Sequence, residues 1–249
     1  MRVALFVTCL ADQFFAEAGV AAVKLLRHLG VEVDFPLAQT CCGQPAYNAG
    51  YWGEARQMAD HTLSVFEGAE YVVLPSGSCT TMLRAFYPEL YRDTPRKFTQ
   101  ALALSGKTYE LAEFIVRVLG VTQLGRGLEG QQIAYHHGCH ALRELGIKNE
   151  PVALLKNAGA EVVDWPAATE CCGFGGLFAV KLPEVSLSMA DRKLSTLPET
   201  DVLTSADGGC LLHLGGRIKG RGLKMAVKPL ASVLWDAVQK VQEENPHAG

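Results

Sequence analysis

Cysteine thiols are the residues of this 249-residue chain that offer the most distinctive chemistry, and they fall into two matching sets. A Cys-Cys-Gly tripeptide occurs at residues 41–43 and again at 171–173. In both sets 31 residues separate a leading cysteine from the tripeptide, and one more cysteine follows it. All eight cysteines belong to these sets, namely Cys9, Cys41, Cys42 and Cys79 in the first, and Cys139, Cys171, Cys172 and Cys210 in the second.

The pattern favours metal binding or catalysis over disulfides. Neighbouring cysteines are poor disulfide partners, because a relaxed disulfide cannot span one peptide bond. The first seven residues predict a strand rather than an export signal, and no apolar run approaches membrane-spanning length. We therefore expect a cytoplasmic protein in a reducing compartment, where such thiols usually bind metals or act in catalysis.

Ligand spacing separates two kinds of metal site. Four thiolates can complete a tetrahedral zinc site or hold an iron–sulfur cluster. Structural zinc ligands usually come in pairs with a short spacer, whereas here the adjacent pair has no spacer and the other thiols stand far apart. Adjacent side chains point in different directions, so they reach two atoms of a polynuclear cluster more easily than one ion. The spacing favours iron–sulfur, and zinc remains the alternative.

Strands and helices are expected to alternate, which predicts an α/β fold with parallel strands. Apolar runs predict strands at residues 2–7, 31–35, 71–74, 132–135, 162–165 and 202–204. Helical periodicity predicts helices at residues 14–29, 54–66, 79–86, 110–119 and 151–158. Residues 88–107 are polar, and we expect irregular structure there. Each cysteine then follows the C-terminal end of a strand, where open α/β sheets bind their ligands.

The chain also contains an internal repeat. Val33-Asp34-Phe35-Pro36 aligns with Val163-Asp164-Trp165-Pro166 at an offset of 130 residues. This predicts two tandem similar lobes, each with a small, mainly parallel sheet flanked by helices. Three glycines within residues 125–130 indicate the boundary, so we expect one domain at residues 1–126 and another at 127–249.

Residues near the cysteines have more than one interpretation. His136, His137 and His140 surround Cys139 and are candidates for ligands, proton carriers or hydrogen-bond donors, or for loop histidines bonded to backbone. Glycines at residues 173–176 predict close approach of the backbone to a bulky cluster. Four arginines are candidates for binding a carboxylate, or else belong to charged helix faces: Arg84, Arg143, Arg217 and Arg221.

The cysteine arrangement resembles the cysteine-rich CCG domain family, and both repeats match it. This family includes one of the subunits of heterodisulfide reductase, the iron–sulfur subunit of glycolate oxidase and lactate utilization proteins. The stretches at residues 5–9, 34–48, 75–79 and 170–176 most resemble the lactate utilization branch. The resemblance covers nearly the whole chain.

The resemblance implies an iron–sulfur electron-transfer subunit of a multi-protein system that oxidises L-lactate to pyruvate. The eight cysteines would hold one or two clusters of 4Fe-4S type, and the chain would be a non-catalytic or co-catalytic oxidoreductase subunit. Its implied partners are a ferredoxin-like iron–sulfur subunit and a third lactate-utilization subunit. The net charge of −3 gives no case for binding nucleic acid.

Two other functions remain open from the sequence. One is a cluster-containing redox enzyme subunit that acts on thiols and disulfides or on another 2-hydroxy acid. The other is a zinc-stabilised scaffold for partner binding. Ligand spacing disfavours the scaffold.

One departure from the family pattern concerns the last cysteine of each set. The heterodisulfide reductase relatives have Cys-x-x-Cys there, whereas this chain has Ser76 and Asp207 at the position of the first cysteine. The Asp207 carboxylate is a candidate ligand in the second set, and a serine hydroxyl would replace a thiolate less readily. We therefore expect the two centres to differ in type, potential or occupancy.

Overall fold

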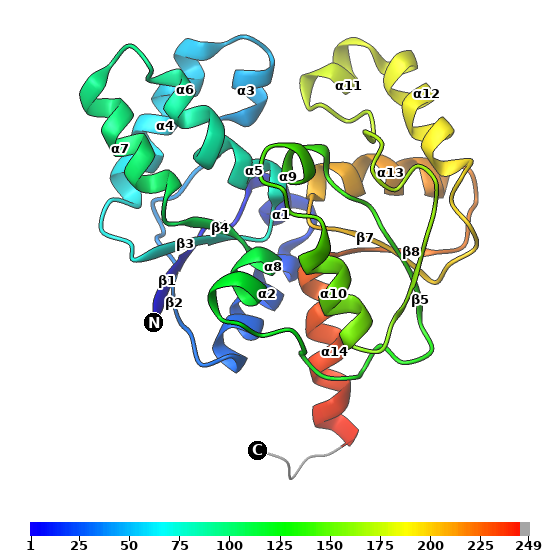
Figure 1. Cartoon of the computed structure of the whole chain (residues 1–249). Helices are drawn as coiled ribbons and strands as arrows, with labels where there is room; N and C mark the ends of the chain where they lie inside the picture. The colour runs from blue at the N-terminus through cyan, green and yellow to red at the C-terminus, as the bar shows by residue number, and fades with distance from the viewer. Residues whose placement is uncertain (245–249) are drawn as a thin grey trace.

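Two α/β lobes make up the computed structural model, which describes residues 1–244 (Figure 1). The first sheet has the strand order β2-β1-β3-β4 and the second has the order β6-β5-β7-β8. All neighbouring strands pair in parallel, so the predicted fold class of two similar lobes is confirmed. The strands are β1 (Arg2–Leu5), β2 (Glu32–Asp34), β3 (Tyr71–Leu74), β4 (Thr108–Glu110), β5 (Gln132–Tyr135), β6 (Glu161–Val163), β7 (Val202–Ser205) and β8 (Ala226–Pro229).

Helices flank both sheets. The first lobe contains α1 (Cys9–Phe14), α2 (Ala16–His28), α3 (Gln44–Asn48), α4 (Trp52–Val65), α5 (Gly77–Thr81), the π-helix η1 (Met82–Phe86), α6 (Tyr87–Leu90), α7 (Pro95–Ser105), α8 (Leu111–Glu113) and the π-helix η2 (Phe114–Val118). The second lobe contains α9 (Cys139–Arg143), α10 (Asn149–Asn157), α11 (Leu177–Lys181), α12 (Pro183–Leu194), α13 (Gly208–Gly220) and α14 (Leu230–Glu244).

A continuous hydrophobic core joins the lobes. One cluster of buried side chains contains Leu5 and Leu25 from the first lobe together with Ile133 and Leu234 from the second. Figure 1 shows α2 and α14 running beside each other beneath the two sheets, and these helices contact each other. The predicted boundary between residues 126 and 127 falls in the segment that links η2 to β5, and the division into domains stays a prediction.

The structure contains elements that the sequence did not predict. Strands β4 and β8 add a fourth strand to each sheet, and residues 88–107, expected to be irregular, contain α7. Pro95 stands in the first turn of α7, and Phe98, Ala101 and Leu104 turn one face of that helix toward the interior. The expectation of irregular structure was therefore wrong, because this polar segment has a narrow apolar face.

The helix predicted at residues 14–29 corresponds to α2, and the structure adds a separate short helix, α1, before it. Backbone angles at Phe15 (φ −141°, ψ 50°) leave the helical region, so α1 ends there and α2 begins at the next residue. As a result Cys9 stands at the start of a short helix of its own. Within residues 1–244 the structure has no helix that is both long and apolar enough to cross a membrane.

Candidate metal centres between the lobes

The cysteines of both lobes meet in one place. In each lobe they follow the C-terminal ends of the strands, the edge at which parallel sheets bind ligands. Seven of the eight cysteines line a single cavity of about 420 Å³, which also contacts α5 of the first lobe and α9 of the second. These seven are Cys9, Cys42, Cys79, Cys139, Cys171, Cys172 and Cys210. The sequence predicted the two sets but not that they share one cavity.

In the first set the adjacent cysteines have different neighbours. The Cys41 sulfur lies 3.6 Å from the Cys9 sulfur, and the Cys42 sulfur lies 3.2 Å from the Cys79 sulfur. Tyr87 holds the loop in place, because its hydroxyl donates to the Cys42 carbonyl at 2.8 Å. The tripeptide thus presents its two thiols to two separate partners.

The second set repeats this arrangement. The Cys172 sulfur lies 3.0 Å from the Cys210 sulfur in α13. The backbone N–H groups of Gly173 and Phe174 approach the sulfurs of Cys171 and Cys172 at 3.4 Å each. Backbone donors beside sulfur stabilise a thiolate and tune the potential of a cluster bound to it.

The thiols of each set polarise one another. Interaction with the neighbouring Cys42 and Cys9 thiols lowers the pKa of Cys41 to about 3, and interaction with the Cys139 and Cys172 thiols lowers the pKa of Cys171 to about 2. The pKa values of these neighbouring thiols are raised in return. One thiolate is therefore favoured in each set, and the thiolate is the form that binds metal.

Glycines allow the backbone to pack closely beside both sets. Gly43 and Gly173 have φ angles of +85° and +87°, which glycine adopts without strain. A Cβ atom on Gly173 would lie 2.7 Å from the Ser186 carbonyl oxygen, and one on Gly209 would lie 2.8 Å from the Phe174 ring. The cavity that the thiols line, rather than the glycines themselves, supplies the space for a thiolate-bound metal cluster.

The lobes are also joined by a carboxylate at the cavity. Asp207 precedes α13 in the second lobe and is 3% exposed, and its Oδ1 accepts a hydrogen bond from the Ser78 N–H of the first lobe at 2.7 Å. Its counterpart Ser76 instead caps its own helix by accepting from the Cys79 N–H at 3.3 Å. Both residues expected to break the family pattern therefore bind the start of α5. A ligand role for Asp207 stays a prediction.

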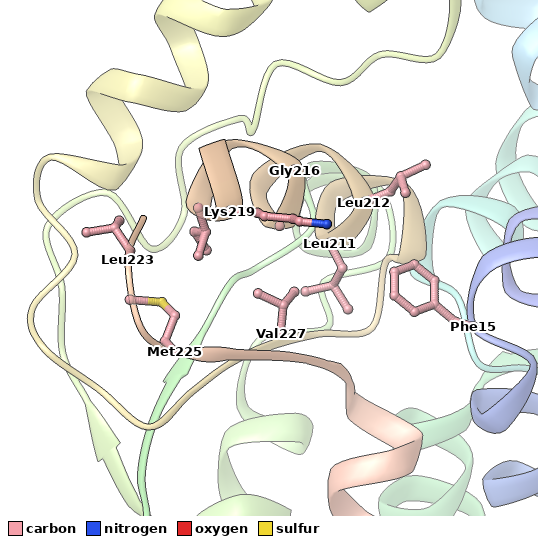
Figure 2. A pocket seen from close by; sticks show the side chains of 10 residues that line it. Phe15, Leu211, Leu212, Gly216, Lys219, Leu223, Met225 and Val227 are labelled. Atoms are coloured by element: carbon pink, nitrogen blue, oxygen red, sulfur yellow. The ribbon is translucent and has the colours of Figure 1, made fainter. Parts of the chain in front are cut away.

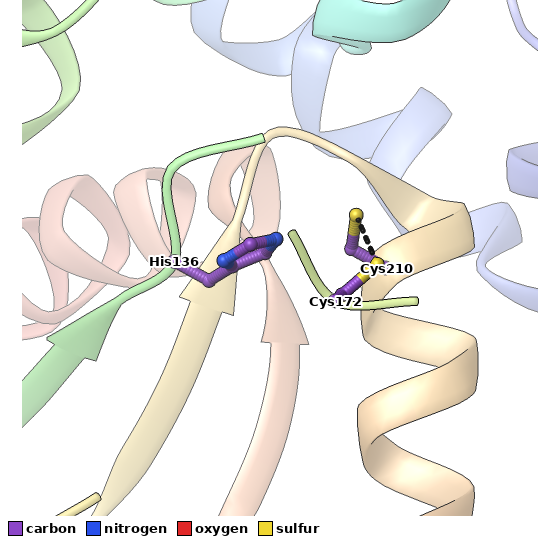
Figure 3. Close-up of side chains that lie close together, drawn as sticks. All are labelled: His136, Cys172 and Cys210. Atoms are coloured by element: carbon purple, nitrogen blue, oxygen red, sulfur yellow. Dashed lines mark hydrogen bonds between the residues drawn. The ribbon is translucent and has the colours of Figure 1, made fainter. Parts of the chain in front are cut away.

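Among the three histidines near Cys139, His136 has the most unusual surroundings. It is completely buried after the end of β5, and its nitrogen lies within 4.8 Å of the sulfurs of Cys172 and Cys210 (Figure 3). Burial, together with the nearby Lys193 ammonium, lowers the pKa of His136 to about 3, so its imidazole is neutral at pH 7. His140 instead lies beside Phe86 and Glu144, and the His137 ring packs on Tyr135.

Lys193 is a buried cation that no motif in the sequence singled out. Its side chain is fully buried in α12, with the ammonium 4.3 Å from the centre of the Trp165 ring. It donates hydrogen bonds to three carbonyls of the loop that leads to Cys171, those of Ala167, Ala168 and Glu170. A signal was available, since Ser186, Ala190 and Lys193 share the inward face of this helix.

The four candidate arginines have different outcomes. Arg143 lines the cavity, together with Gln44 and Asn48. The other three form ion pairs on the helices, Arg84 with Glu113 at 2.7 Å and Arg217 and Arg221 with Asp191. Of the four, only Arg143 is placed to meet a carboxylate in the cavity.

A second cavity, of about 390 Å³, lies beside α13 and β8 (Figure 2). Apolar side chains from Phe15, Leu211, Met225 and Val227 line it, and Lys219 is its one charged lining residue in the described chain. This lining offers no thiol, imidazole or carboxylate among the residues that the structure describes. The chemistry therefore belongs to the cavity between the lobes.

The cysteine sets and the repeated fold define the class of protein. The model of the cysteine-rich domain, CCG, matches residues 3–84 and 133–215, one match in each lobe. The chain therefore belongs to the cysteine-rich CCG domain family, as the resemblance in the sequence indicated.

Curated relatives narrow the comparison. The chain is 49% identical to lactate utilization protein A of Geobacillus sp. (strain WCH70) over 237 residues, which cover 94% of this chain and 99% of that protein. It is 46% identical to lactate utilization protein A of Bacillus subtilis (strain 168) with the same coverage. The resemblance to the lactate utilization branch is thereby confirmed.

A solved structure shows a similar fold. The crystal structure of a hypothetical protein from Helicobacter pylori matches with a TM-score of 0.64 and 11% sequence identity. The match covers 98% of this chain and 51% of that one. At this identity the likeness concerns the fold alone.

Proposed function

We propose that this chain is an iron–sulfur electron-transfer subunit of a multi-protein system that oxidises L-lactate to pyruvate. The observation that carries the proposal is that seven of the eight thiols, drawn from both sets, line one cavity between the lobes. The assignment of lactate as the substrate rests on the relatives, which are named lactate utilization protein A and match nearly the whole chain.

Two ligand sets suit the chemistry of lactate. Oxidation of lactate to pyruvate releases two electrons and two protons, and iron–sulfur centres usually take electrons one at a time. Cys9, Cys41, Cys42 and Cys79 would hold the first centre, and the corresponding four cysteines of the second lobe would hold the other. Shared access to one cavity supports passage of electrons between them.

The buried surroundings support a redox role over a purely structural one. Cys42 and Cys172 are 2% and 3% exposed, whereas Cys9, Cys41, Cys139 and Cys171 are only partly buried. Each set therefore has one side protected by the lobe and one more open side. A structural zinc site has no comparable need for an open side.

The proposal includes two partners, a ferredoxin-like iron–sulfur subunit and a third subunit of the lactate system. Electrons from lactate would pass through this chain to or from the ferredoxin-like subunit. Their presence is tested by purifying the chain anaerobically from cells with an affinity tag and identifying co-purifying proteins. Isolation of the chain without either partner under mild conditions would contradict this part of the proposal.

Addition of L-lactate to the anaerobically reconstituted three-protein complex tests the function. We expect the cluster absorbance of this subunit to bleach with L-lactate and to recover with an electron acceptor. The control is a complex carrying both Cys42→Ser and Cys172→Ser, which should form no pyruvate. Pyruvate formation at the same rate with that variant would contradict the electron-transfer role.

A further inference from the structure

The two lobes differ at one buried position beside their metal ligands. His136 follows β5, and its backbone N–H donates to the Thr204 carbonyl at 2.8 Å. Phe6 follows β1 in the same way, and its N–H donates to the Val73 carbonyl at 2.9 Å. Both side chains are completely buried. An imidazole in the second lobe thus replaces a phenyl ring in the first.

The His136 ring lacks the partners that a buried imidazole normally has. Among the residues that the structure describes, neither of its ring nitrogens has a partner with good hydrogen-bond geometry, and the nearby Ala168 carbonyl already accepts from the His137 N–H at 3.1 Å. An unpaired buried polar group destabilises a fold, so such groups in folded proteins usually have a function or an absent partner. In Figure 3 the ring extends from the end of β5 toward the segment that carries Cys172, with Cys210 beyond it.

The spacing of these three residues suits a shared metal atom. The imidazole nitrogen and the sulfurs of Cys172 and Cys210 all lie within 4.8 Å of one another. Metal–nitrogen bonds are about 2.0 Å long and metal–sulfur bonds about 2.3 Å, so one atom reaches all three after small side-chain adjustments. In the described chain His136, Cys172 and Cys210 form the single such group that contains a histidine.

A second difference between the lobes changes the charge around the centre. A Cβ atom added to the tripeptide glycine meets equivalent helix residues in the two lobes, Ala55 and Met58 in the first and Ser186 and Met189 in the second. By this correspondence the buried Lys193 occupies the position of Thr62. The second lobe therefore surrounds its thiols with a cation and an imidazole, where the first lobe has neither at these two positions.

We infer that His136 is a nitrogen ligand to the metal centre of the second lobe, bound to the atom that Cys172 and Cys210 approach. This inference rests on the proposed metal-binding function. The second centre is then a mixed imidazole–thiolate centre, whereas the first has thiolate ligands alone. Counting thiols and imidazoles alone, the second lobe offers five donors, four thiols and one imidazole, against four thiols in the first.

This assignment fixes an order of reduction potentials. Imidazole is a neutral ligand, so it adds no negative charge to the four thiolates of the second centre. The buried Lys193 ammonium lies near the Cys172 and Cys210 thiols and raises the potential of that centre, because a positive charge favours the reduced state. Electrons that enter the chain are expected to collect at the second centre.

Nitrogen hyperfine spectroscopy on the anaerobically reconstituted chain tests the ligand directly. The protein is labelled with ¹⁵N-histidine and carries Cys42→Ser, so that only the second centre contributes. We expect a strongly coupled ¹⁵N signal that disappears in the additional variant His136→Phe, which copies the first lobe. The neighbouring His137→Phe serves as the matched control and should keep the signal.

A second variant covers the case in which His136→Phe fails to fold or to bind iron. His136→Cys retains a ligand at this position, so it should keep its iron, lose the nitrogen coupling and show a lower reduction potential. An iron–sulfur centre in wild-type protein without nitrogen coupling, or with only the weak coupling of a hydrogen bond, overturns the inference and leaves the proposed function intact.

Failure of the proposed function has a different signature. A chain that binds zinc without sulfide is not an iron–sulfur subunit. In that case Co²⁺ is substituted for zinc and the same labelled variants are compared. If the wild-type chain shows ¹⁵N coupling to Co²⁺ and His136→Phe loses it, the ligand assignment is still supported. If the wild-type chain shows no ¹⁵N coupling to Co²⁺, the ligand assignment is overturned.

Discussion

Asp207 of the second lobe accepts a hydrogen bond at 2.7 Å from the backbone N–H of Ser78 in the first lobe. This N–H belongs to the first turn of α5, the helix that carries Cys79. First-turn N–H groups have no partner within their own helix, and a carboxylate is a favourable acceptor for them. The bond therefore ties the start of one lobe's ligand helix to the loop that precedes the other lobe's Cys210.

Replacing Asp207 should weaken the association of the lobes. We expect Asp207→Ala to lower the free energy of unfolding by about 1–3 kcal/mol, because a buried hydrogen bond to a charged group is lost. Asp207→Asn keeps an acceptor oxygen and should lose less. Urea denaturation of the reduced, metal-free chain measures both. Equal stability of Asp207→Ala and wild type would show that the bond does not stabilise the fold.

The same pair of variants tests whether Asp207 is a metal ligand. An asparagine side chain still offers an oxygen to the Ser78 N–H at the start of α5, but it is a much weaker metal ligand than a carboxylate. If Asp207 binds the second centre, Asp207→Asn should lose iron from that centre while keeping most of its stability. Unchanged iron content in Asp207→Asn would restrict Asp207 to the structural role.

We expect the fold to require glycine at position 138, because the Asp207 side chain leaves no space for a larger residue there. The φ angle of −60° at Gly138 is open to any residue, but an added Cβ would overlap the Asp207 Oδ2 atom. Gly138→Ala should therefore cost about 1–3 kcal/mol, as overpacking usually does. In an Asp207→Ala background the same substitution should cost little. A double-mutant cycle by urea denaturation checks this, and additive effects would contradict it.

Two single variants, each lacking one buried thiol, should show whether the two sets bind iron independently. Cys42→Ser is expected to abolish the first centre and Cys172→Ser the second, so each loses about half of the bound iron. Iron analysis of the anaerobically reconstituted proteins measures this. Loss of all iron in either single variant would indicate one centre shared across the cavity rather than two.

Glu110 gives a pH-dependent prediction away from the cysteines. Its carboxyl caps α8 by accepting from the N–H groups of Ala112 and Glu113, and burial raises its pKa to about 8. In the unfolded chain it ionises near pH 4.5. Between these values the folded state binds the extra proton, so its contribution to stability is largest at low pH and falls as the pH rises.

Glu110→Gln should remove this dependence, because the amide does not ionise and still offers an acceptor oxygen. Relative to wild type, the variant is expected to gain on the order of 1 kcal/mol per pH unit between pH 5 and pH 8. Urea denaturation of the metal-free chain at several pH values measures the difference. The exposed Glu161→Gln is the control, and parallel pH profiles for Glu110→Gln and wild type would contradict the argument.

The sequence predicted the fold well where the local pattern was strong. Strands β3 and β5 have the predicted bounds, because short apolar runs end in glycine, proline or histidine loops. Strands β4 and β8 were not predicted, since three or four residues with mixed burial give no periodic signal. Their strand character depends on pairing with β3 and β7, which are distant in the chain.

The candidate site was predictable in composition but not in arrangement. Matched spacing identified all eight cysteines, and the positions of the strand ends indicated that each set would gather. The meeting of both sets at one cavity depends on the packing of α5 against α9. A Cβ on Gly77 would lie 2.5 Å from the Ala141 Cβ. Such contacts between lobes, like that of Asp207 with Ser78, leave no local pattern in the sequence.

Anaerobic analysis of iron and acid-labile sulfide, with electron paramagnetic resonance before and after reduction, tests the central claim most directly. Two thiolate sets that hold iron–sulfur centres predict equal amounts of iron and sulfide, about four of each per occupied set. They also predict paramagnetic signals that change on reduction. Stoichiometric zinc without sulfide would contradict the account and favour a zinc-stabilised scaffold.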